Sequence, residues 1–341
     1  MSAIALGETG PTFGGNMPSL RPTYTAEDEG KFDQALGYLQ SGDIARVSAL
    51  EWEVLWDPKG DYNFRGIDAE IKKMAEKGVV PLWLLQPCPH PSSGWYQTKW
   101  NDWWLPSREI WTQAIKMNTT VALHIVAETK KYTSNPPMFQ IWNEPQGGKP
   151  GGSTTSKYGE WVPALHEYFY KIVKDLRANQ IARSQIVGPA VSSYGENRQS
   201  EAAEFLSMIP PKNFDWMAEC GYRDRHIRFS AQHAGGDPEK VRQGFEESLA
   251  WYQWIEDHFT WPKDQKVMIT EFYLTPGDCG VKMGTDLYPY HKIAFEILQE
   301  ASFSDVIAWG LRPDEADQKG NPFATFGGVG DSLVKWRTGS N

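Results

Sequence analysis

The sequence has few cysteines and no long hydrophobic run. Its 341 residues include three cysteines, Cys88, Cys220 and Cys279, which lie far apart in the chain. An odd number of cysteines without metal-ligand spacing argues against a disulfide framework and against a structural zinc site. No stretch of about 18 apolar residues occurs, so the sequence contains no candidate transmembrane helix.

Positive charge is also in short supply. The chain has 34 Lys and Arg against 43 Asp and Glu, which gives a formal net charge of −9. Nucleic acid needs basic stripes on its partner, so this balance disfavours a nucleic-acid partner and also an anionic membrane surface. What the sequence has in excess is tryptophan, with 16 residues. Trp is large and flat and is seldom fully buried, so some of these side chains fill the core and others are candidates for stacking on sugar rings.

Strand-like and helix-like segments alternate along the chain. Strands are expected at 44–52, 79–87, 137–145, 185–193, 226–236, 266–276 and 305–313. Helical periodicity fills the intervals, as at 66–78, where Ile67, Ile71 and Met74 share a face and Gly78 is placed to end the helix. The segment ALGETG, residues 5–10, precedes a predicted helix at 26–40 and is the candidate for a further, first strand.

Eight strands that alternate with helices predict a closed (β/α)8 TIM barrel, formed by residues 1–341 as a single domain. The alternative is an open doubly wound sheet, which would carry a glycine-rich turn after its first strand. The segment PTFGGN, residues 11–16, contains glycines but lacks the G-x-G-x-x-G order, and no helix follows it at once. After residue 313 only a short helix fits, so the eighth helix is expected to be short or irregular.

Two glutamates end predicted strands. Glu144 follows the apolar segment PMFQIWN, and Glu271 follows KVMIT three strands later. In a barrel of this kind the chemistry lies at the C-terminal ends of the strands, and strands three apart face each other. Two opposed carboxylates are the arrangement of a glycosidase, in which one acid protonates the leaving oxygen and the other acts on the opposite face of the sugar.

Strand alternation gives a second expectation about these glutamates. Side chains two residues apart on a strand point to the same face. Two sets are therefore expected to share a face with their glutamate: Met138, Gln140, Trp142 and Glu144 on one strand, and Val267, Ile269 and Glu271 on the other.

The motif around Glu144 resembles that of a known enzyme group. Asn143-Glu144-Pro145 after an apolar strand, with Ile-Thr-Glu ending at Glu271, resembles the retaining glycoside hydrolases of clan A, which are (β/α)8 barrels. Families 5 and 39 of that clan have similar layouts. An arginine inside the second strand, followed by a Gly-x-Tyr-x-Phe turn and a helix, is also similar, and the resemblance covers residues 40 to 312.

The resemblance implies roles for particular residues. Glu144 would be the general acid/base and Glu271 the nucleophile. Asn143 would hydrogen-bond the sugar 2-hydroxyl, a contact that tightens in the transition state. Arg46 would lie under the nucleophile and keep it ionised, since a nearby positive charge lowers the pKa of a carboxyl group. Trp309, on the last strand, would form the platform beneath the sugar at the cleavage point.

Other positions are candidates for substrate contact. The clan has a histidine after its third strand, which suggests His90, and a His-x-Tyr motif on its sixth strand. Here the predicted sixth strand contains FSAQHAGG, with Gln232 and His233 but no tyrosine two residues later. The aromatic segment 92–106 follows the third strand in a loop setting, and Trp95 and Trp103 are the candidates in it for stacking on sugar.

The resemblance thus implies a retaining glycosidase that cleaves β-linked sugars without a cofactor or metal, and the tryptophans in the predicted loops favour a polysaccharide that is cut internally. Glucan, mannan, xylan and a bacterial exopolysaccharide all remain candidate substrates. The alternatives are a non-catalytic carbohydrate-binding barrel and a metal-dependent barrel hydrolase, which would want a His-x-His pair on the first strand. The start MSAIALGETG lacks the basic residues and the long apolar run of a signal peptide. We expect a secreted or periplasmic protein whose signal is absent from this chain, and the alternative is a cytoplasmic protein.

Overall fold

The computed structural model describes residues 11–48, 62–85, 108, 111–143, 155–188, 191–192, 215–262, 264–282, 284–301, 303–308, 311 and 328–339. In these residues one parallel sheet is built from β1 (Thr12–Asn16), β2 (Ile44–Ser48), β3 (Val80–Leu85), β4 (Met138–Ile141), β5 (Ile186–Val187), β6 (Val191–Ser192), β7 (Tyr222–Arg228), β8 (Lys266–Tyr273) and β9 (Asp305–Ala308).

The sheet closes on itself. β1 pairs with β9, and β5 pairs with β7, so the described strands leave no open edge at these positions. The short strands β5 and β6 both pair with β7 and together occupy one place, which gives an eight-place barrel. The predicted (β/α)8 barrel is therefore confirmed, and the open doubly wound sheet is excluded.

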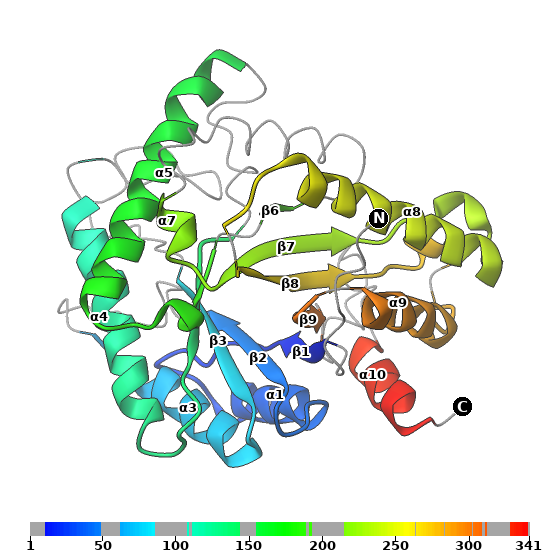
Figure 1. The fold of residues 1–341 in the computed structure, drawn as a ribbon. Coiled ribbons are helices and arrows are strands. Elements are labelled where there is room, and N and C mark those ends of the chain that lie inside the picture. Colours follow the sequence, from blue (N-terminus) through cyan, green and yellow to red (C-terminus); the bar gives the residue numbers. More distant parts are fainter. Residues whose placement is uncertain are drawn as a thin grey trace.

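Helices surround the strands, as Figure 1 shows. They are α1 (Ala26–Gly37), α3 (Arg65–Lys77), α4 (Trp111–Thr129), α5 (Thr155–Ala178), α7 (Asp215–Ala218), α8 (Pro238–His258), α9 (Tyr288–Glu300) and α10 (Val329–Thr338). Helix α3 ends where the sequence predicts, because Gly78 adopts φ +76°, a left-handed conformation that glycine tolerates. The last helix, α10, is short as expected, and Arg337 fixes it to the start of β2 through two hydrogen bonds of 2.7 Å to Asp43.

The predicted first strand, ALGETG at residues 5–10, lies outside the described residues, and the first strand that the structure describes is β1. Its sequence TFGGN offers little alternation because two of its five residues have no side chain. The glycines are needed for close packing. A Cβ at Gly14 would lie 2.2 Å from the backbone oxygen of Ile44, and one at Gly15 would lie 1.9 Å from Leu311 Cδ1.

The sixth barrel strand also differs from the prediction. Strand β7 runs from Tyr222 to Arg228, whereas 226–236 was expected, and residues Gln232–Ala234 form the short helix η6. The strand was missed because five of its seven residues, YRDRHIR, are Arg, Asp or His. Three of these, Asp224, Arg225 and His226, are buried, which a pattern based on hydrophobicity does not detect.

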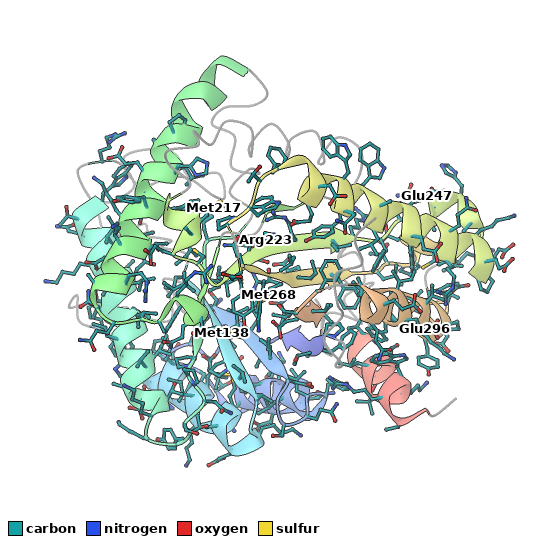
Figure 2. The ribbon with its side chains drawn as sticks, in the orientation of Figure 1. Met138, Met217, Arg223, Glu247, Met268 and Glu296 are labelled. Carbon is teal, nitrogen blue, oxygen red and sulfur yellow. The ribbon has the colours of Figure 1, made fainter. Side chains whose placement is uncertain are left out.

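The barrel interior has an apolar layer below a polar one. The apolar layer consists of Ile44, Leu82, Met138, Val187, Met268 and Ile307. Met138 and Met268 lie among the strands at the centre of Figure 2, whereas Glu247 and Glu296 lie on the surrounding helices. Arg46, Gln140 and Thr270 each follow one of these apolar residues by two positions, so the polar layer lies toward the C-terminal ends of the strands.

Candidate active site

Arg46 is the centre of the polar layer. Its side chain is buried on β2 and donates to four different residues. Nη1 donates to Glu271 Oε1 at 2.7 Å and to Asn16 Oδ1 at 2.8 Å. Nε donates to Gln140 Oε1 at 2.6 Å, and Nη2 donates to Asn143 Oδ1 at 2.8 Å. The planar guanidinium thus joins β1, β2, β4 and β8 and gives Glu271 a fixed, charge-assisted hydrogen bond.

The arrangement also fixes the orientation of the Asn143 amide. Arginine has only donors, so Asn143 must present its oxygen to Arg46. Gln140 Nε2 also points at that oxygen, at 3.5 Å. The Asn143 amide N–H groups therefore point away from the guanidinium and remain available as donors to another group.

Glu271 reaches the interior through a bulge in β8. Arg225 on β7 pairs with Ile269, but the next residue, His226, pairs with Glu271, so Thr270 is an extra residue. The pairing register between β8 and β9 also shifts, between Ile269 and Phe272. The expected common face of Val267, Ile269 and Glu271 is therefore wrong, since Val267 and Ile269 belong to the outer core. Thr270 and Glu271 both contact interior groups, because the bulge re-aims the strand end.

The expected common face on β4 is wrong in a similar way. Trp142 adopts φ +64°, which turns the chain just after β4 ends at Ile141. Its indole ring packs outward against Tyr168 and Phe169 of α5, with ring centroids 6.1 and 5.9 Å apart. Asn143 faces Arg46 instead. A left-handed tryptophan is rare, and backbone strain of this kind clusters at functional sites.

A buried chain of polar groups continues from Glu271 into the barrel. His226 Nδ1 lies 3.5 Å from Glu271 Oε2, and His226 Nε2 lies 3.1 Å from Thr270 Oγ1. The Thr270 hydroxyl donates to Asp224 Oδ1 at 2.6 Å. Burial raises the pKa of the Asp224 carboxyl from its ordinary value to about 7. The ionised form of Asp224 is therefore unfavourable in this buried position.

The structure brings together three of the predicted site residues, Arg46, Asn143 and Glu271. It places Gln232 and His233 exposed on η6, beyond the end of β7, so their role stays a prediction. The remaining predicted site residues lie outside the described residues: Glu144, His90, Trp95, Trp103 and Trp309.

Sequence analysis missed Asn16, Gln140 and His226. Gln140 could have been found, because it lies on the same strand face as Met138 and precedes Asn143 by three residues. His226 offered no such signal, because it lies in the strand YRDRHIR, whose charged residues hide the strand pattern. Arg228 donates to Asp278 Oδ1 at 2.9 Å.

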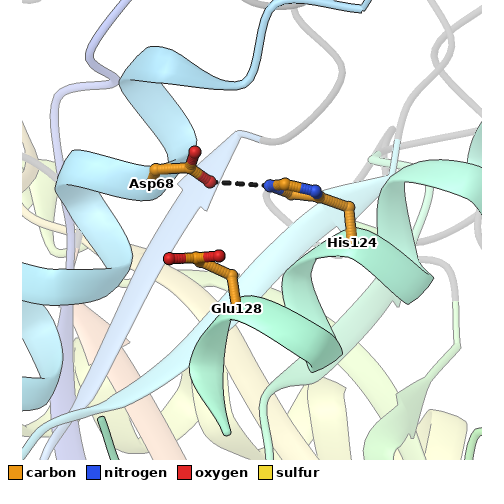
Figure 3. Close-up of side chains that lie close together, drawn as sticks. All are labelled: Asp68, His124 and Glu128. Carbon is orange, nitrogen blue, oxygen red and sulfur yellow. Dashed lines mark hydrogen bonds and ion pairs between the residues drawn. The ribbon is translucent and has the colours of Figure 1, made fainter. Parts of the chain in front are cut away.

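A group that could hold a metal ion lies on the outer helices. Asp68 of α3 and His124 and Glu128 of α4 place their ligand atoms within 4.8 Å of one another (Figure 3). His124 Nε2 is 2.6 Å from Asp68 Oδ1, and Glu128 accepts from Lys131 and Tyr132. The Asp68–His124 hydrogen bond joins α3 to α4, whereas the contacts of Glu128 stay at the C-terminal end of α4. Strand β1 carries no histidine, so the His-x-His pair of a metal-dependent barrel hydrolase is missing from it.

No helix in the described part of the chain has the length and hydropathy that a membrane span requires. Neither protein-family models nor curated protein sequences match the chain.

Solved structures do match it. A glucosidase from Croceicoccus marinus aligns with 96% of this chain at 13% identity and TM-score 0.56, and the aligned part is 65% of the glucosidase, less than two thirds of its length. A family 39 glycoside hydrolase from Xanthomonas axonopodis pv. citri aligns with 98% of this chain and 68% of its own, at 13% identity and TM-score 0.52. A broad-specificity family 5 endoglucanase from Clostridium acetobutylicum aligns over 97% of both chains, at 14% identity and TM-score 0.57.

These similarities concern the fold. The predicted likeness to families 5 and 39 is confirmed at that level, because this chain folds as the same kind of (β/α)8 barrel as the solved glycoside hydrolases it matches.

Proposed function

We propose that the protein is a retaining glycoside hydrolase that cleaves β-glycosidic bonds within a polysaccharide. The observation that carries the proposal is the clamp in which Arg46 holds the carboxylate of Glu271 and the amide oxygen of Asn143 at the C-terminal end of the barrel. Glu144 is the residue after Asn143, so covalent geometry keeps its Cα about 3.8 Å from that of Asn143. Arg46 thus holds the proposed nucleophile and the residue that precedes the proposed acid/base in the chain.

In the first step Glu271 acts as the nucleophile. Its carboxylate oxygen forms a bond to the anomeric carbon while the bond from that carbon to the glycosidic oxygen breaks. Glu144 donates its proton to the departing oxygen, and the first sugar product leaves. The Asn143 amide, whose N–H groups point away from Arg46, donates to the hydroxyl next to the anomeric carbon.

In the second step water displaces Glu271 from the anomeric carbon. Glu144, now ionised, accepts a proton from water, whose oxygen bonds to the anomeric carbon as the bond to Glu271 breaks. Two inversions give net retention of configuration. Carboxyl groups about 5–5.5 Å apart favour this route.

The substrate side of the proposal rests on aromatic residues and on the neighbours. Trp309 would form the platform under the sugar, while Trp95 and Trp103 would stack on further sugar units of a polymer. His90, Gln232 and His233 would supply polar contacts around it. An endoglucanase is among the matched structures, and glucan, mannan, xylan and bacterial exopolysaccharide are the substrates to test.

The test is the release of new reducing ends from these polysaccharides. The wild-type protein is expected to cleave at least one of them, and Glu271→Ala is expected to bind it without cleaving. Glu247→Ala is the matched control, since Glu247 is exposed on α8 and accepts a hydrogen bond from Gln243 of the same helix. Full activity of Glu271→Ala would contradict the assignment, and binding without cleavage by the wild type would favour the carbohydrate-binding alternative.

The stereochemistry can be followed by proton NMR during turnover. The first-formed product is expected to keep the β configuration. Initial formation of the α anomer would contradict the double displacement and with it the role of Glu271 as a nucleophile.

A further inference from the structure

The side-chain alternation of β4 is reversed where the strand ends. Gln140 contacts Arg46 inside the barrel, and the next residue, Ile141, packs in the outer core. A regular strand would continue with Trp142 inside and Asn143 outside. Trp142 instead lies in the outer core, and Asn143 contacts Arg46 inside the barrel. The left-handed conformation of Trp142, with φ +64°, therefore exchanges the sides of the two residues.

Two hydrogen bonds hold the backbone of Trp142. Its N–H donates to the backbone oxygen of Leu85 on β3 at 3.2 Å, so residue 142 stays in register with the neighbouring strand. Its carbonyl oxygen accepts from Gln140 Nε2 at 3.1 Å. This second partner is a side chain that lies two residues earlier on the same strand. A left-handed conformation is unfavourable for tryptophan, so it persists only where the surrounding contacts fix it.

The amide of Gln140 is oriented by its neighbours. Arg46 Nε is a donor and lies 2.6 Å from one atom of this amide, so that atom must be the oxygen. The amide nitrogen then faces two acceptors, the Trp142 carbonyl at 3.1 Å and, more weakly, Asn143 Oδ1 at 3.5 Å. Glutamine supplies an acceptor and two donors in these directions, whereas an ionised glutamate supplies acceptors alone. The surroundings of position 140 therefore favour an amide over a carboxylate.

We propose that Gln140 is a positioning residue that holds the reversed alternation at Trp142 and so directs Asn143 into the barrel. It acts on the site through the Trp142 carbonyl and the Asn143 amide. The structural part of this inference concerns the backbone conformation alone. The catalytic part rests on the proposed function, in which the Asn143 amide donates to the sugar and Glu144 follows Asn143 in the chain.

Burial makes the contact between Gln140 and Trp142 hard to replace. Both residues are fully buried, and Asn143 is 7% exposed. Without the Gln140 amide, the Trp142 carbonyl oxygen loses its donor, and an unsatisfied carbonyl in a buried place is unfavourable. Rotation of the peptide group between Trp142 and Asn143 turns this oxygen away and relieves the cost. The same rotation changes the direction in which the Asn143 side chain leaves the backbone.

The first test is structural and needs no substrate. Crystal structures of the full chain at pH 8 compare the wild type with Gln140→Met and Gln140→Glu. Methionine has a similar volume but no hydrogen-bonding amide, and ionised glutamate keeps the acceptor for Arg46 but has no N–H for the Trp142 carbonyl. In both variants the Trp142 carbonyl is expected to turn away from position 140. The 2.8 Å contact between Arg46 Nη2 and Asn143 Oδ1 is expected to break.

Three outcomes would overturn the inference. The first is a Trp142 backbone and an Asn143 contact that stay unchanged in either variant. The second is an extended Trp142 in the wild-type crystal, which decides the question even where a variant does not fold. The third comes from the matched control Met138→Leu, two residues earlier on the same face and in the apolar layer. It is expected to leave Trp142 and Asn143 in place, and an equal displacement there would mean that any change in interior packing moves the turn.

Kinetics test the catalytic part on a polysaccharide that the wild type cleaves. Gln140→Met, which adds no charge, is expected to lower kcat about tenfold with little change in KM, because the Asn143 contact to the sugar tightens in the transition state. In the Asn143→Ala background the same change is expected to cost less than about threefold, since the residue through which Gln140 acts is gone. Equal losses in the two backgrounds would contradict the positioning role.

The outcomes separate this inference from the proposed function. If the protein cleaves no polysaccharide, the proposed function fails, while the crystal structures still decide whether Gln140 holds the Trp142 turn. If Glu271→Ala is inactive but Trp142 and Asn143 keep their positions without the Gln140 amide, the positioning role fails and the glycosidase proposal stands.

Discussion

Two arginine–glutamate pairs are buried on opposite sides of the barrel wall. Arg46 and Glu271 lie inside it, 2.7 Å apart, with side-chain exposures of 4% and 10%. Arg225 of β7 and Glu256 of α8 lie outside it, 3.0 Å apart, with exposures of 1% and 7%. Burial and distance are nearly the same in the two pairs, so neither property separates the proposed nucleophile, Glu271, from the structural carboxylate of Glu256.

The difference lies in the other partners. Both oxygens of Glu256 are occupied, since Oε1 accepts from Arg225 and Tyr252 and Oε2 accepts from Arg223. Trp261 also covers Arg225, with the guanidinium carbon 4.5 Å from the ring centroid. This outer cluster fastens α8 to β7. Among the described residues, Glu271 contacts one arginine, Arg46, through Oε1. Its Oε2 lies 3.5 Å from His226 Nδ1, which is longer than an ordinary hydrogen bond.

The largest difference between the pairs is expected from Glu271→Gln. If Glu271 is the nucleophile as proposed, its loss is expected to lower kcat on the order of 10⁴-fold or more. The folded structure is expected to persist, because the new amide keeps an oxygen for Arg46. Single-turnover assays measure the effect, and an unchanged circular dichroism spectrum checks the fold. A loss below tenfold would show that the inner pair is structural like the outer one.

Glu256→Gln is the matched change in the outer pair. It leaves the buried Arg225 and the partly buried Arg223 without their shared counter-charge, which is expected to lower the free energy of unfolding by about 3 kcal/mol. Urea unfolding measures this loss. Activity per folded molecule is expected to stay within about twofold of wild type. A large drop in kcat would contradict a purely structural role for the outer pair.

Arg46→Lys and Arg225→Lys compare the two cations. Lysine cannot reproduce the fork that holds Glu271, Asn16, Gln140 and Asn143 together. Arg46→Lys is therefore expected to lower kcat/KM about 100-fold, equivalent to about 2.7 kcal/mol. Arg225→Lys is expected to leave kcat/KM unchanged in the folded protein. Equal losses in both variants would mean that the guanidinium geometry at Arg46 has no special role.

The smallest expected effect is the pH dependence of stability, which has opposite signs for His291 in the surrounding helices and Asp224 in the barrel interior. Burial lowers the pKa of His291 on α9 to about 4, so the folded state binds fewer protons than the unfolded state as pH falls below 6.5. Stability is therefore lost on acidification, by about 1 kcal/mol between pH 7 and 5.5. Asp224 has the opposite sign, because its raised pKa makes its contribution fall as pH rises from 4 to 7.

His291→Asn isolates the histidine contribution. The asparagine amide can replace Nδ1, which lies 2.9 Å from Ser332 Oγ on α10. The change in unfolding free energy between pH 7 and 5.5 is expected to shrink by about 1 kcal/mol in this variant. An unchanged pH dependence would show that His291 does not contribute.

The sequence by itself determined the alternation of strands and helices, the end of α3 at Gly78 and the short last helix. It also indicated Arg46, Asn143 and Glu271 as candidate site residues. These depend on periodicity, on glycine conformation and on a local motif, all of which lie within a short stretch of chain. Even β7 and β1 have local reasons for being missed, since charged residues and glycines hide the strand pattern.

Only the tertiary structure decided which residues meet. The bulge at Thr270, the outward turn of Trp142 and the contact of His226 with Glu271 depend on the register between neighbouring strands. Arg46 and Glu271 are separated by 225 residues in the chain. A shift of one residue in a strand reverses which side chains enter the barrel, and that shift is set by packing with distant segments and not by local sequence.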